Sequence, residues 1–179
     1  MSPGWHRKDL LSLRELSEGE LRQVLATAKV FKEILGRPIK KVPSLQGRTV
    51  VNLFVEPSTR TKISFELAAV RLSADVVSLD KDSSSIRKGE SLKDTAKNLE
   101  ALQAGIIVIR HRSAGAAHFL ADRLKASVIN AGDGAHEHPT QGLLDTFTIQ
   151  ERLGKIEGAR VLIVGDIIHS RVARSNLWA

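Results

Sequence analysis

Apolar residues along this chain follow two spacings, one typical of buried strands and one typical of helices. Five short, apolar and β-branched runs predict strands at residues 49–55, 76–79, 106–109, 127–130 and 161–164. Apolar residues three or four positions apart predict helices between them, at residues 64–72, 91–103, 116–124 and 141–153. This alternation predicts an α/β fold, with a mainly parallel sheet covered by helices on both faces.

A further helix is expected before the first strand. Ser17 is followed three residues later by Glu20, which is a capping box at a helix start. Apolar residues then recur at helical spacing up to Leu35, where Gly36 and Pro38 end the pattern.

The chain is expected to divide near residue 150. Residues 1–150 contain four of the predicted strands and are expected to form a complete domain. Residues 151–179 supply a polar, glycine-containing stretch and one more strand, and a lone parallel strand would expose an unpaired edge. We therefore expect residues 151–179 to be a linker and the first strand of a second α/β domain, truncated relative to its natural design.

Composition narrows the functional classes. Hydrophobic residues make up 42% and charged residues 26% of the chain, which are ordinary values for a globular protein. No apolar run approaches the roughly 20 residues of a membrane span, and the N-terminus lacks a signal-peptide core, so a cytoplasmic location without membrane contact is expected. There is no cysteine, which excludes disulfides, zinc–thiolate sites and cysteine nucleophiles.

The net charge of +7 favours anionic partners. The basic residues are dispersed and aromatic residues are only 4%, whereas single-strand binders interleave cations with aromatic platforms. A small phosphorylated metabolite is therefore a better candidate than nucleic acid.

The first predicted strand leads into a turn that is suited to binding phosphate. Ser58, Thr59, Arg60 and Thr61 place three hydroxyls and a guanidinium between this strand and the following helix. Free backbone N–H groups and the positive end of the helix dipole favour an anion at such a turn.

Polar and cationic side chains follow the other predicted strands as well. They are Ser84 and Lys88, then Arg110 and His111, then His138 and Gln141, and finally Arg171. Ligands of open parallel sheets bind outside the carboxyl ends of the strands, so one anionic ligand would account for all of these residues. Each also has a purely structural alternative, such as a helix cap, a solvated charge or a structural histidine.

The chemistry of these residues favours positioning and charge stabilisation over covalent catalysis. The chain has no Gly-rich Walker loop, no evident carboxylate cluster for magnesium and no nucleophile elbow. Cations, hydroxyls and a histidine around phosphate suit a reaction in which phosphate is a bound leaving group.

Taken jointly, the motifs resemble those of the aspartate and ornithine carbamoyltransferases. They span residues 54–61, 88–95, 110–111, 132–141 and 165–176. The Glu-Pro before Ser58, the Gly-Asp-Gly before His138 and the His-Ser-Arg after Asp166 resemble aspartate enzymes more than ornithine enzymes. The resemblance runs from about Leu10 to Ala179 and covers roughly the first half of that family's catalytic subunit.

This resemblance implies a reaction and a domain plan. Carbamoyl phosphate and L-aspartate would give N-carbamoyl-L-aspartate and phosphate, in an early step of pyrimidine biosynthesis. Residues 1–150 would form the carbamoyl-phosphate-binding domain and residues 151–179 the start of an aspartate-binding domain. The resemblance implies no metal and no organic cofactor.

The resemblance also implies roles for individual residues. Residues 58–61 would hold the phosphate, and Arg110 would bridge the phosphate and the carbonyl oxygen. Thr61, Arg110 and His138 would donate hydrogen bonds to that oxygen as the amine attacks.

The remaining implied roles concern the carbamoyl amide, the second substrate and a neighbouring subunit. Gln141 would bind the carbamoyl NH2 group, and Arg171 would bind an aspartate carboxylate. Ser84 and the catalytic Lys88 would enter the adjacent subunit's site, which implies a homotrimer with shared active sites. Dihydroorotase or a regulatory chain is a further partner found among relatives.

Three alternatives stay open at this stage. In the first, the acceptor of the carbamoyl group is ornithine in place of aspartate. In the second, this chain is a non-catalytic phosphate-binding or assembly module. The third and most remote alternative is a nucleic-acid-binding protein.

Overall fold

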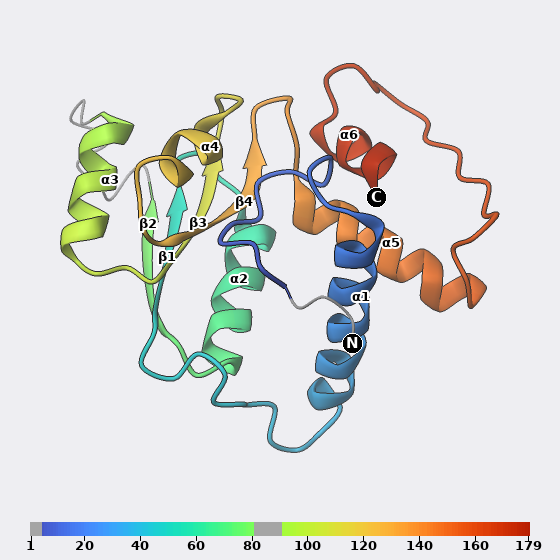
Figure 1. Cartoon of the computed structure of the whole chain (residues 1–179), viewed down its shortest axis with the longest axis horizontal. Helices are drawn as coiled ribbons and strands as arrows, with labels where there is room; N and C mark the ends of the chain where they lie inside the picture. The colour runs from blue at the N-terminus through green and yellow to red at the C-terminus, as the bar shows by residue number, and fades with distance from the viewer. Residues whose placement is uncertain (1–4, 81–90) are drawn as a thin grey trace.

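The computed structural model describes residues 5–80 and 91–179, and its centre is a four-stranded parallel sheet (Figure 1). The strands are β1 (Thr49–Phe54), β2 (Asp75–Asp80), β3 (Ile106–His111) and β4 (Ser127–Asp133). Their order in the sheet is β2-β1-β3-β4, and each neighbouring pair is parallel. The predicted parallel sheet is therefore confirmed, with β1 and β3 at its centre.

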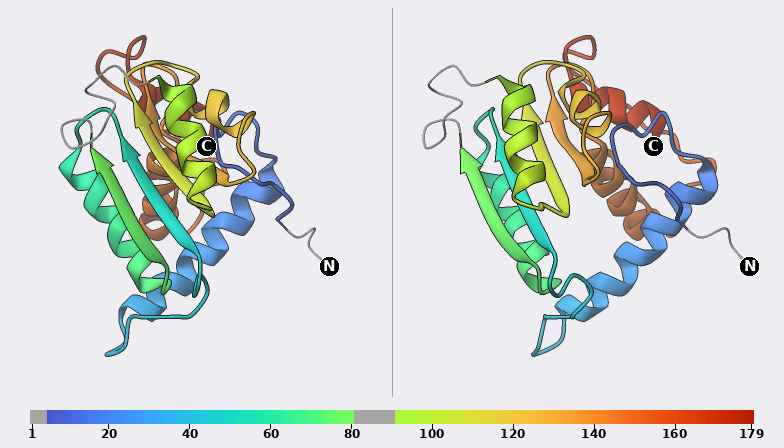
Figure 2. Two further views of the ribbon diagram at one scale, coloured as in Figure 1. Left: turned by 90° about the vertical axis from the view of Figure 1, so that its left-hand side faces the viewer. Right: turned by 60° about the vertical axis from the view of Figure 1, so that its left-hand side comes forward.

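Helices cover both faces of this sheet, as predicted (Figure 2). They are α1 (Glu18–Leu35), α2 (Thr59–Arg71), α3 (Leu92–Ala101), α4 (Ala116–Ala121), α5 (Pro139–Leu153) and α6 (Arg171–Trp178). One apolar cluster joins the sheet to α2 through Phe54 and Ala69. The other joins the opposite face to α3 and α4 through Leu53, Leu99 and Leu120. No helix within residues 5–80 and 91–179 is long and apolar enough to cross a membrane.

The N-terminal segment closes the outer edge of β4. The Leu10 N–H donates to the Val128 carbonyl at 2.9 Å, and the Asn130 N–H donates to the Leu10 carbonyl at 2.9 Å. The capping box at Ser17 and Glu20 then starts α1 as predicted, and α1 packs against α5.

The predicted strand at residues 161–164 is absent, so this prediction was wrong. The segment lies in an extended connection between α5 and α6 (Figure 1), and Val161, Leu162 and Val164 are exposed, Leu162 by 86%. A strand requires a neighbour for its backbone groups, and no strand of the described residues lies beside this segment. The division of the chain near residue 150 stays a prediction.

Helix α6 docks closely on α5 through a glycine. A Cβ added at Gly142 would lie 2.7 Å from the Leu13 Cδ1 and 3.0 Å from the Ser175 Cβ. Only a residue without a side chain allows α5, α6 and the N-terminal segment to approach this closely.

We expect Gly142→Ala to lower the free energy of unfolding by about 1–3 kcal/mol, because the added methyl group overpacks this contact. Urea denaturation measures the change. Gly19→Ala is the matched control, since its added Cβ would meet nothing closer than the Ser17 Oγ at 4.0 Å. The control should be neutral or stabilising by up to about 1 kcal/mol. Equal stability of the two variants would refute the close packing of α6.

Candidate functional site

The turn after β1 delivers hydroxyl groups to the start of α2. Ser58 is the N-cap residue, but its side chain makes no capping bond; instead its Oγ donates to the Thr61 Oγ1 at 2.9 Å. Thr59 and Arg60 occupy the first turn of α2 and are exposed. Because the Ser58 side chain makes no capping bond within the described residues, the first N–H groups of α2 can donate hydrogen bonds to an anion, as the phosphate interpretation requires.

Two arginines from distant parts of the chain share one carboxylate beside this turn. The Arg110 Nη2 donates to the Glu56 Oε1 at 2.5 Å. Arg171 binds the same carboxylate through two nitrogens, from Nη2 to Oε1 at 2.6 Å and from Nη1 to Oε2 at 3.1 Å. The side chains of Arg110 and Arg171 are only 12% and 15% exposed, so these charges are largely removed from water. The structure thus brings together Arg110 and Arg171, as predicted, and adds Glu56.

The end of β4 is shaped to accept both guanidinium groups. The Arg110 Nη1 donates to the Ala131 carbonyl and the Arg171 Nη1 to the Gly134 carbonyl, each at 3.2 Å. A Cβ on Gly132, whose φ is 113°, would lie 2.9 Å from the Arg171 Nε and 3.1 Å from the Arg110 Nη1. Glycine at 132 therefore has a direct physical role in gathering the two cations.

The charges and hydrogen bonds around Arg110 favour the binding of an anion. Burial, followed by the charge of Arg171, lowers the pKa of Arg110, while hydrogen bonds from Arg171 lower the pKa of Glu56. In the described part of the chain, two guanidinium groups share one carboxylate, so these three side chains together carry a net positive charge. The buried Arg110 Nε has no hydrogen-bond partner among the described residues. A further acceptor such as a phosphate or carbonyl oxygen would satisfy it.

His138 lies at the N-cap of α5 and is held neutral. Its residue exposure is 7%, and burial together with the charges of Arg110 and Arg171 lowers the pKa of its ring to about 4. Near neutral pH the ring therefore carries one N–H donor and no charge. Such a group can donate a hydrogen bond to a developing oxyanion.

A buried carboxylate, which sequence reasoning missed, fixes the backbone of His138. Glu137 accepts hydrogen bonds from the Ser12 hydroxyl, from the Leu13 N–H at 2.9 Å and from the Ser175 hydroxyl at 3.0 Å. The Ser175 Oγ in turn accepts the His138 N–H at 2.9 Å. Ser12 and Ser175 lie 125 and 38 residues from Glu137 along the chain, so no local pattern indicates these contacts.

For the other predicted site residues, the structure gives no hydrogen bond with Arg110 or Arg171 among the described residues. The Gln141 Nε2 donates to the Asp145 Oδ1 at 2.9 Å, so its described hydrogen bond runs along α5 rather than to the arginines. Ser84 and Lys88 lie outside the described residues. The predicted roles of all these side chains stay predictions.

We expect Glu56→Gln to lower the free energy of unfolding by about 1.5–3 kcal/mol, the typical contribution of hydrogen bonds to charged groups, because it leaves two close guanidinium groups uncompensated. The lowered pKa of Glu56 also sets a pH dependence. Its stabilisation is complete above the carboxyl pKa of the unfolded chain and is lost as pH falls through the lower folded value. Denaturation at several pH values should show a larger loss of stability on acidification in the parent protein than in the variant, because other carboxyl groups with lowered pKa values, such as Glu20, remain in both.

Glu157→Gln is the control, because Glu157 forms an exposed ion pair with Arg22 in which the two side chains are 60% and 56% exposed. It should leave stability unchanged. An equal effect of the two substitutions would contradict the special role of Glu56.

Comparison with known proteins places this site in a family context. Residues 8–151 match the family described as aspartate/ornithine carbamoyltransferase, carbamoyl-P binding domain. The chain is 61% identical over 172 residues to an aspartate carbamoyltransferase catalytic subunit of Halothermothrix orenii, covering 96% of this chain and 55% of that relative. A catalytic subunit of Opitutus terrae is also 61% identical, over 175 residues, covering 98% of this chain and 56% of the relative.

Solved structures agree with the sequence comparison. Aspartate transcarbamoylase from Trypanosoma cruzi, in complex with carbamoyl phosphate and aspartate, superposes with a TM-score of 0.88 at 34% identity, over 95% of this chain and 53% of that one. The catalytic subunit of M. jannaschii aspartate transcarbamoylase superposes with a TM-score of 0.86 at 39% identity, over 96% of this chain and 56% of that one. The chain therefore spans a little over half the length of the relatives it matches.

Proposed function

Because this chain belongs to the aspartate and ornithine carbamoyltransferase family, we propose that the protein transfers the carbamoyl group of carbamoyl phosphate to L-aspartate. The products are N-carbamoyl-L-aspartate and phosphate, in pyrimidine biosynthesis. The observation that carries this proposal is the pair of largely buried guanidinium groups of Arg110 and Arg171, gathered on Glu56 beside the start of α2. This arrangement supplies positive charge where a small dianion would bind.

In the proposed complex, the phosphate lies at the N-terminus of α2. Residues 58–61 contribute hydroxyls, a guanidinium and backbone N–H groups to its oxygens. Anions at a helix N-terminus gain from both the free N–H donors and the helix dipole. Arg110 adds a charge-assisted donor from the neighbouring strand, and its Nε, which has no partner within residues 5–80 and 91–179, supports this assignment.

Catalysis then depends on stabilising charge on the carbonyl oxygen. The amine of aspartate attacks the carbonyl carbon and the carbonyl oxygen becomes negative. The C=O bond then re-forms as the C–O bond to phosphate breaks, and the leaving phosphate takes up the proton that the amine loses. Thr61, Arg110 and neutral His138 donate hydrogen bonds to this oxygen in our proposal. Donors fixed before the reaction lower the barrier without reorganising. The Glu137–Ser175 hydrogen bonds support this by fixing the backbone of His138, from which the ring extends.

Arg171 and Gln141 serve recognition in this proposal. The two-nitrogen contact of Arg171 with Glu56 supports a preference for carboxylates, and we assign it an aspartate carboxylate. Gln141 would bind the carbamoyl NH2 group after release from Asp145. We further propose that Ser84 and Lys88 complete a neighbouring subunit's site in a cytoplasmic homotrimer. The association with dihydroorotase or a regulatory chain stays a prediction.

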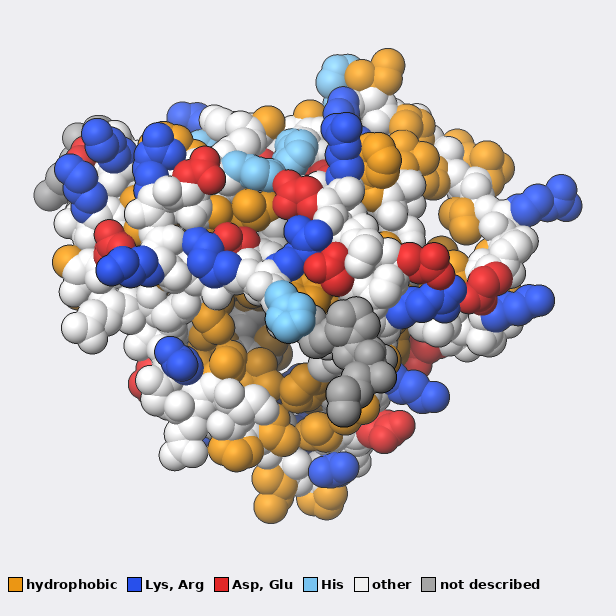
Figure 3. All heavy atoms as spheres, viewed as in Figure 1, with side chains coloured by type: hydrophobic (Ala, Val, Ile, Leu, Met, Phe, Trp, Pro, Cys, Tyr) orange, Lys and Arg blue, Asp and Glu red, His pale blue; other side chains and the backbone are white. Residues whose placement is uncertain are grey.

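The alternatives receive less support. The named relatives are aspartate enzymes, which disfavours ornithine as the acceptor. Basic and acidic side chains are interspersed over the face of the molecule seen in Figure 3, whereas a nucleic-acid surface concentrates positive charge.

Steady-state turnover of the full-length protein with carbamoyl phosphate and each amino acid tests the proposed function. We expect phosphate release with L-aspartate and none with L-ornithine. Exclusive use of ornithine would overturn the choice of acceptor, and turnover with neither would support a binding or assembly module.

Arg60→Ala should lower kcat/KM roughly 150-fold, because about 3 kcal/mol of charge-assisted stabilisation of the transition state is lost. Arg37→Ala removes another exposed arginine, between α1 and β1, and should leave kcat/KM unchanged. Near-normal kcat/KM in the Arg60 variant would contradict a phosphate-binding role.

The ring of His138 should titrate near pH 4 without ligand, and its pKa should rise when phosphate neutralises Arg110 and Arg171. Histidine NMR spectra with and without inorganic phosphate measure the pKa, and His138→Asn identifies the signal. Acidification from pH 6.5 to about 4 should also lower stability, because over this window the proton binds the unfolded chain only. A pKa that phosphate leaves unchanged would place His138 outside the anion site.

A further inference from the structure

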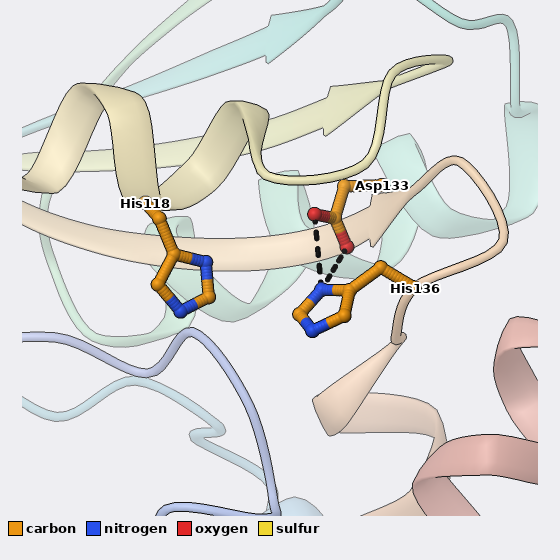
Figure 4. A group of neighbouring side chains, drawn as sticks. All are labelled: His118, Asp133 and His136. Atoms are coloured by element: carbon orange, nitrogen blue, oxygen red, sulfur yellow. Dashed lines mark hydrogen bonds and ion pairs between the residues drawn. The ribbon is translucent and has the colours of Figure 1, made fainter.

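Three side chains outside the proposed reaction form a cluster with the donor atoms of a metal site. His118 lies on α4, Asp133 ends β4, and His136 lies in the turn before α5. One donor atom of each lies within 4.8 Å of the other two. Figure 4 shows both rings and the carboxylate turned toward one another, although they come from three separate segments.

The spacing of these atoms suits a first-row transition metal. The His136 Nδ1 lies 3.1 Å from each oxygen of Asp133. Two ligands of a tetrahedral Zn²⁺ ion, bound at about 2.0–2.1 Å, lie about 3.3 Å apart, so this pair needs almost no movement. The donor atoms of the three residues lie within 4.8 Å of one another, so the ring of His118, whose side chain is 37% exposed, must shift slightly to complete the site.

Groups around the cluster already hold its members in position. The His118 Nε2 lies 3.0 Å from the Glu15 Oε1, which leaves Nδ1 as the ring nitrogen available to a metal. Metal-binding histidines usually donate their second ring N–H to a carboxylate in this manner. The Asp133 carboxylate is 1% exposed and accepts the Asn130 Nδ2 and the Gly115 N–H, each at 2.7 Å.

The alternative to a metal site is that His136 and Asp133 form only a hydrogen bond with each other. The chain contains another histidine–aspartate pair that serves as a comparison. His169 and Asp166 have the same spacing and a contact of 2.9 Å, but their side chains are 76% and 65% exposed. Among the described residues, His169 and Asp166 have no second histidine beside them that would complete a group of three ligands. The cluster at Asp133 has a second histidine, a carboxylate (Glu15) next to the Nε2 of His118, and a buried carboxylate in Asp133 itself.

We propose that His118, Asp133 and His136 bind one divalent transition-metal ion of the Zn²⁺, Co²⁺ or Ni²⁺ type, with water completing the coordination. Two imidazole nitrogens and one carboxylate oxygen are a ligand set that these ions accept. The ion joins α4 to the turn that carries His138, two residues after His136. It therefore stabilises this corner of the sheet and takes no part in carbamoyl transfer.

Titration of the tag-free, full-length protein with Zn²⁺ against a chromophoric chelator tests this site without reference to activity. We expect one Zn²⁺ per chain and a rise in Tm on binding. His118→Gln and His136→Asn should each weaken binding at least about 10-fold. His169→Asn is the matched control and should bind Zn²⁺ as tightly as the parent protein.

NMR spectra of ¹⁵N-labelled histidine rings in the unmodified protein provide a second measurement that no folding defect can obscure. Addition of Zn²⁺ should shift the rings of His118 and His136 and leave the ring of His169 unchanged. Absence of stoichiometric binding would overturn the proposal, as would binding that persists in both variants. Shifts at other histidine rings alone would also overturn it. None of these measurements depends on carbamoyl transfer, so they test the metal site independently of the proposed enzymatic function.

Discussion

The arrangement of this molecule depends on one carboxylate holding two guanidinium groups together. Without Glu56, the largely buried side chains of Arg110 and Arg171 would repel each other where water screens them poorly. Their proximity explains the need for glycine at 132 and, with burial, the lowered pKa of His138. The same charges leave a net positive region at the carboxyl edge of the sheet, which is the property that a phosphate-releasing reaction requires.

The fold supplies this interaction by joining distant segments. Glu56 follows β1, Arg110 is the second-last residue of β3 and Arg171 begins α6, so the cluster requires both the sheet and α6 to be in place. The buried Glu137 has a parallel function, since it connects the N-terminal segment to Ser175 and the backbone of His138. Both carboxylates therefore couple stability to the geometry of the site.

Local sequence patterns were sufficient for most of the fold. The four strands from β1 to β4 lie where apolar runs predicted them. For β1, β3 and β4 the apolar runs match burial in the sheet, whereas β2 is an edge strand whose Val77 is exposed. Helix α2 begins at Thr59, earlier than the predicted 64–72, since its polar first turn has no apolar periodicity. The prediction of a strand at 161–164 was wrong, because a strand needs a neighbouring strand for its backbone hydrogen bonds and local sequence does not specify whether one is present. Motifs at strand ends predicted Arg110, His138 and Arg171 as site residues; the structure places both arginines on Glu56 and their charges near His138, while their roles stay predictions. The contacts of Glu56 and Glu137 connect residues distant in sequence, so local patterns did not predict them.

The central claim is that residues 58–61, Arg110 and the arginine pair around Glu56 form one binding site for a small dianion. A crystal structure of the full-length protein with a phosphonate-containing bisubstrate analogue tests this most directly. The account predicts the phosphonate at the first turn of α2, with Arg110 donating to it and Arg171 contacting a carboxylate of the analogue. An analogue bound elsewhere, with Arg110 and the α2 turn making no contact to it, would contradict the account.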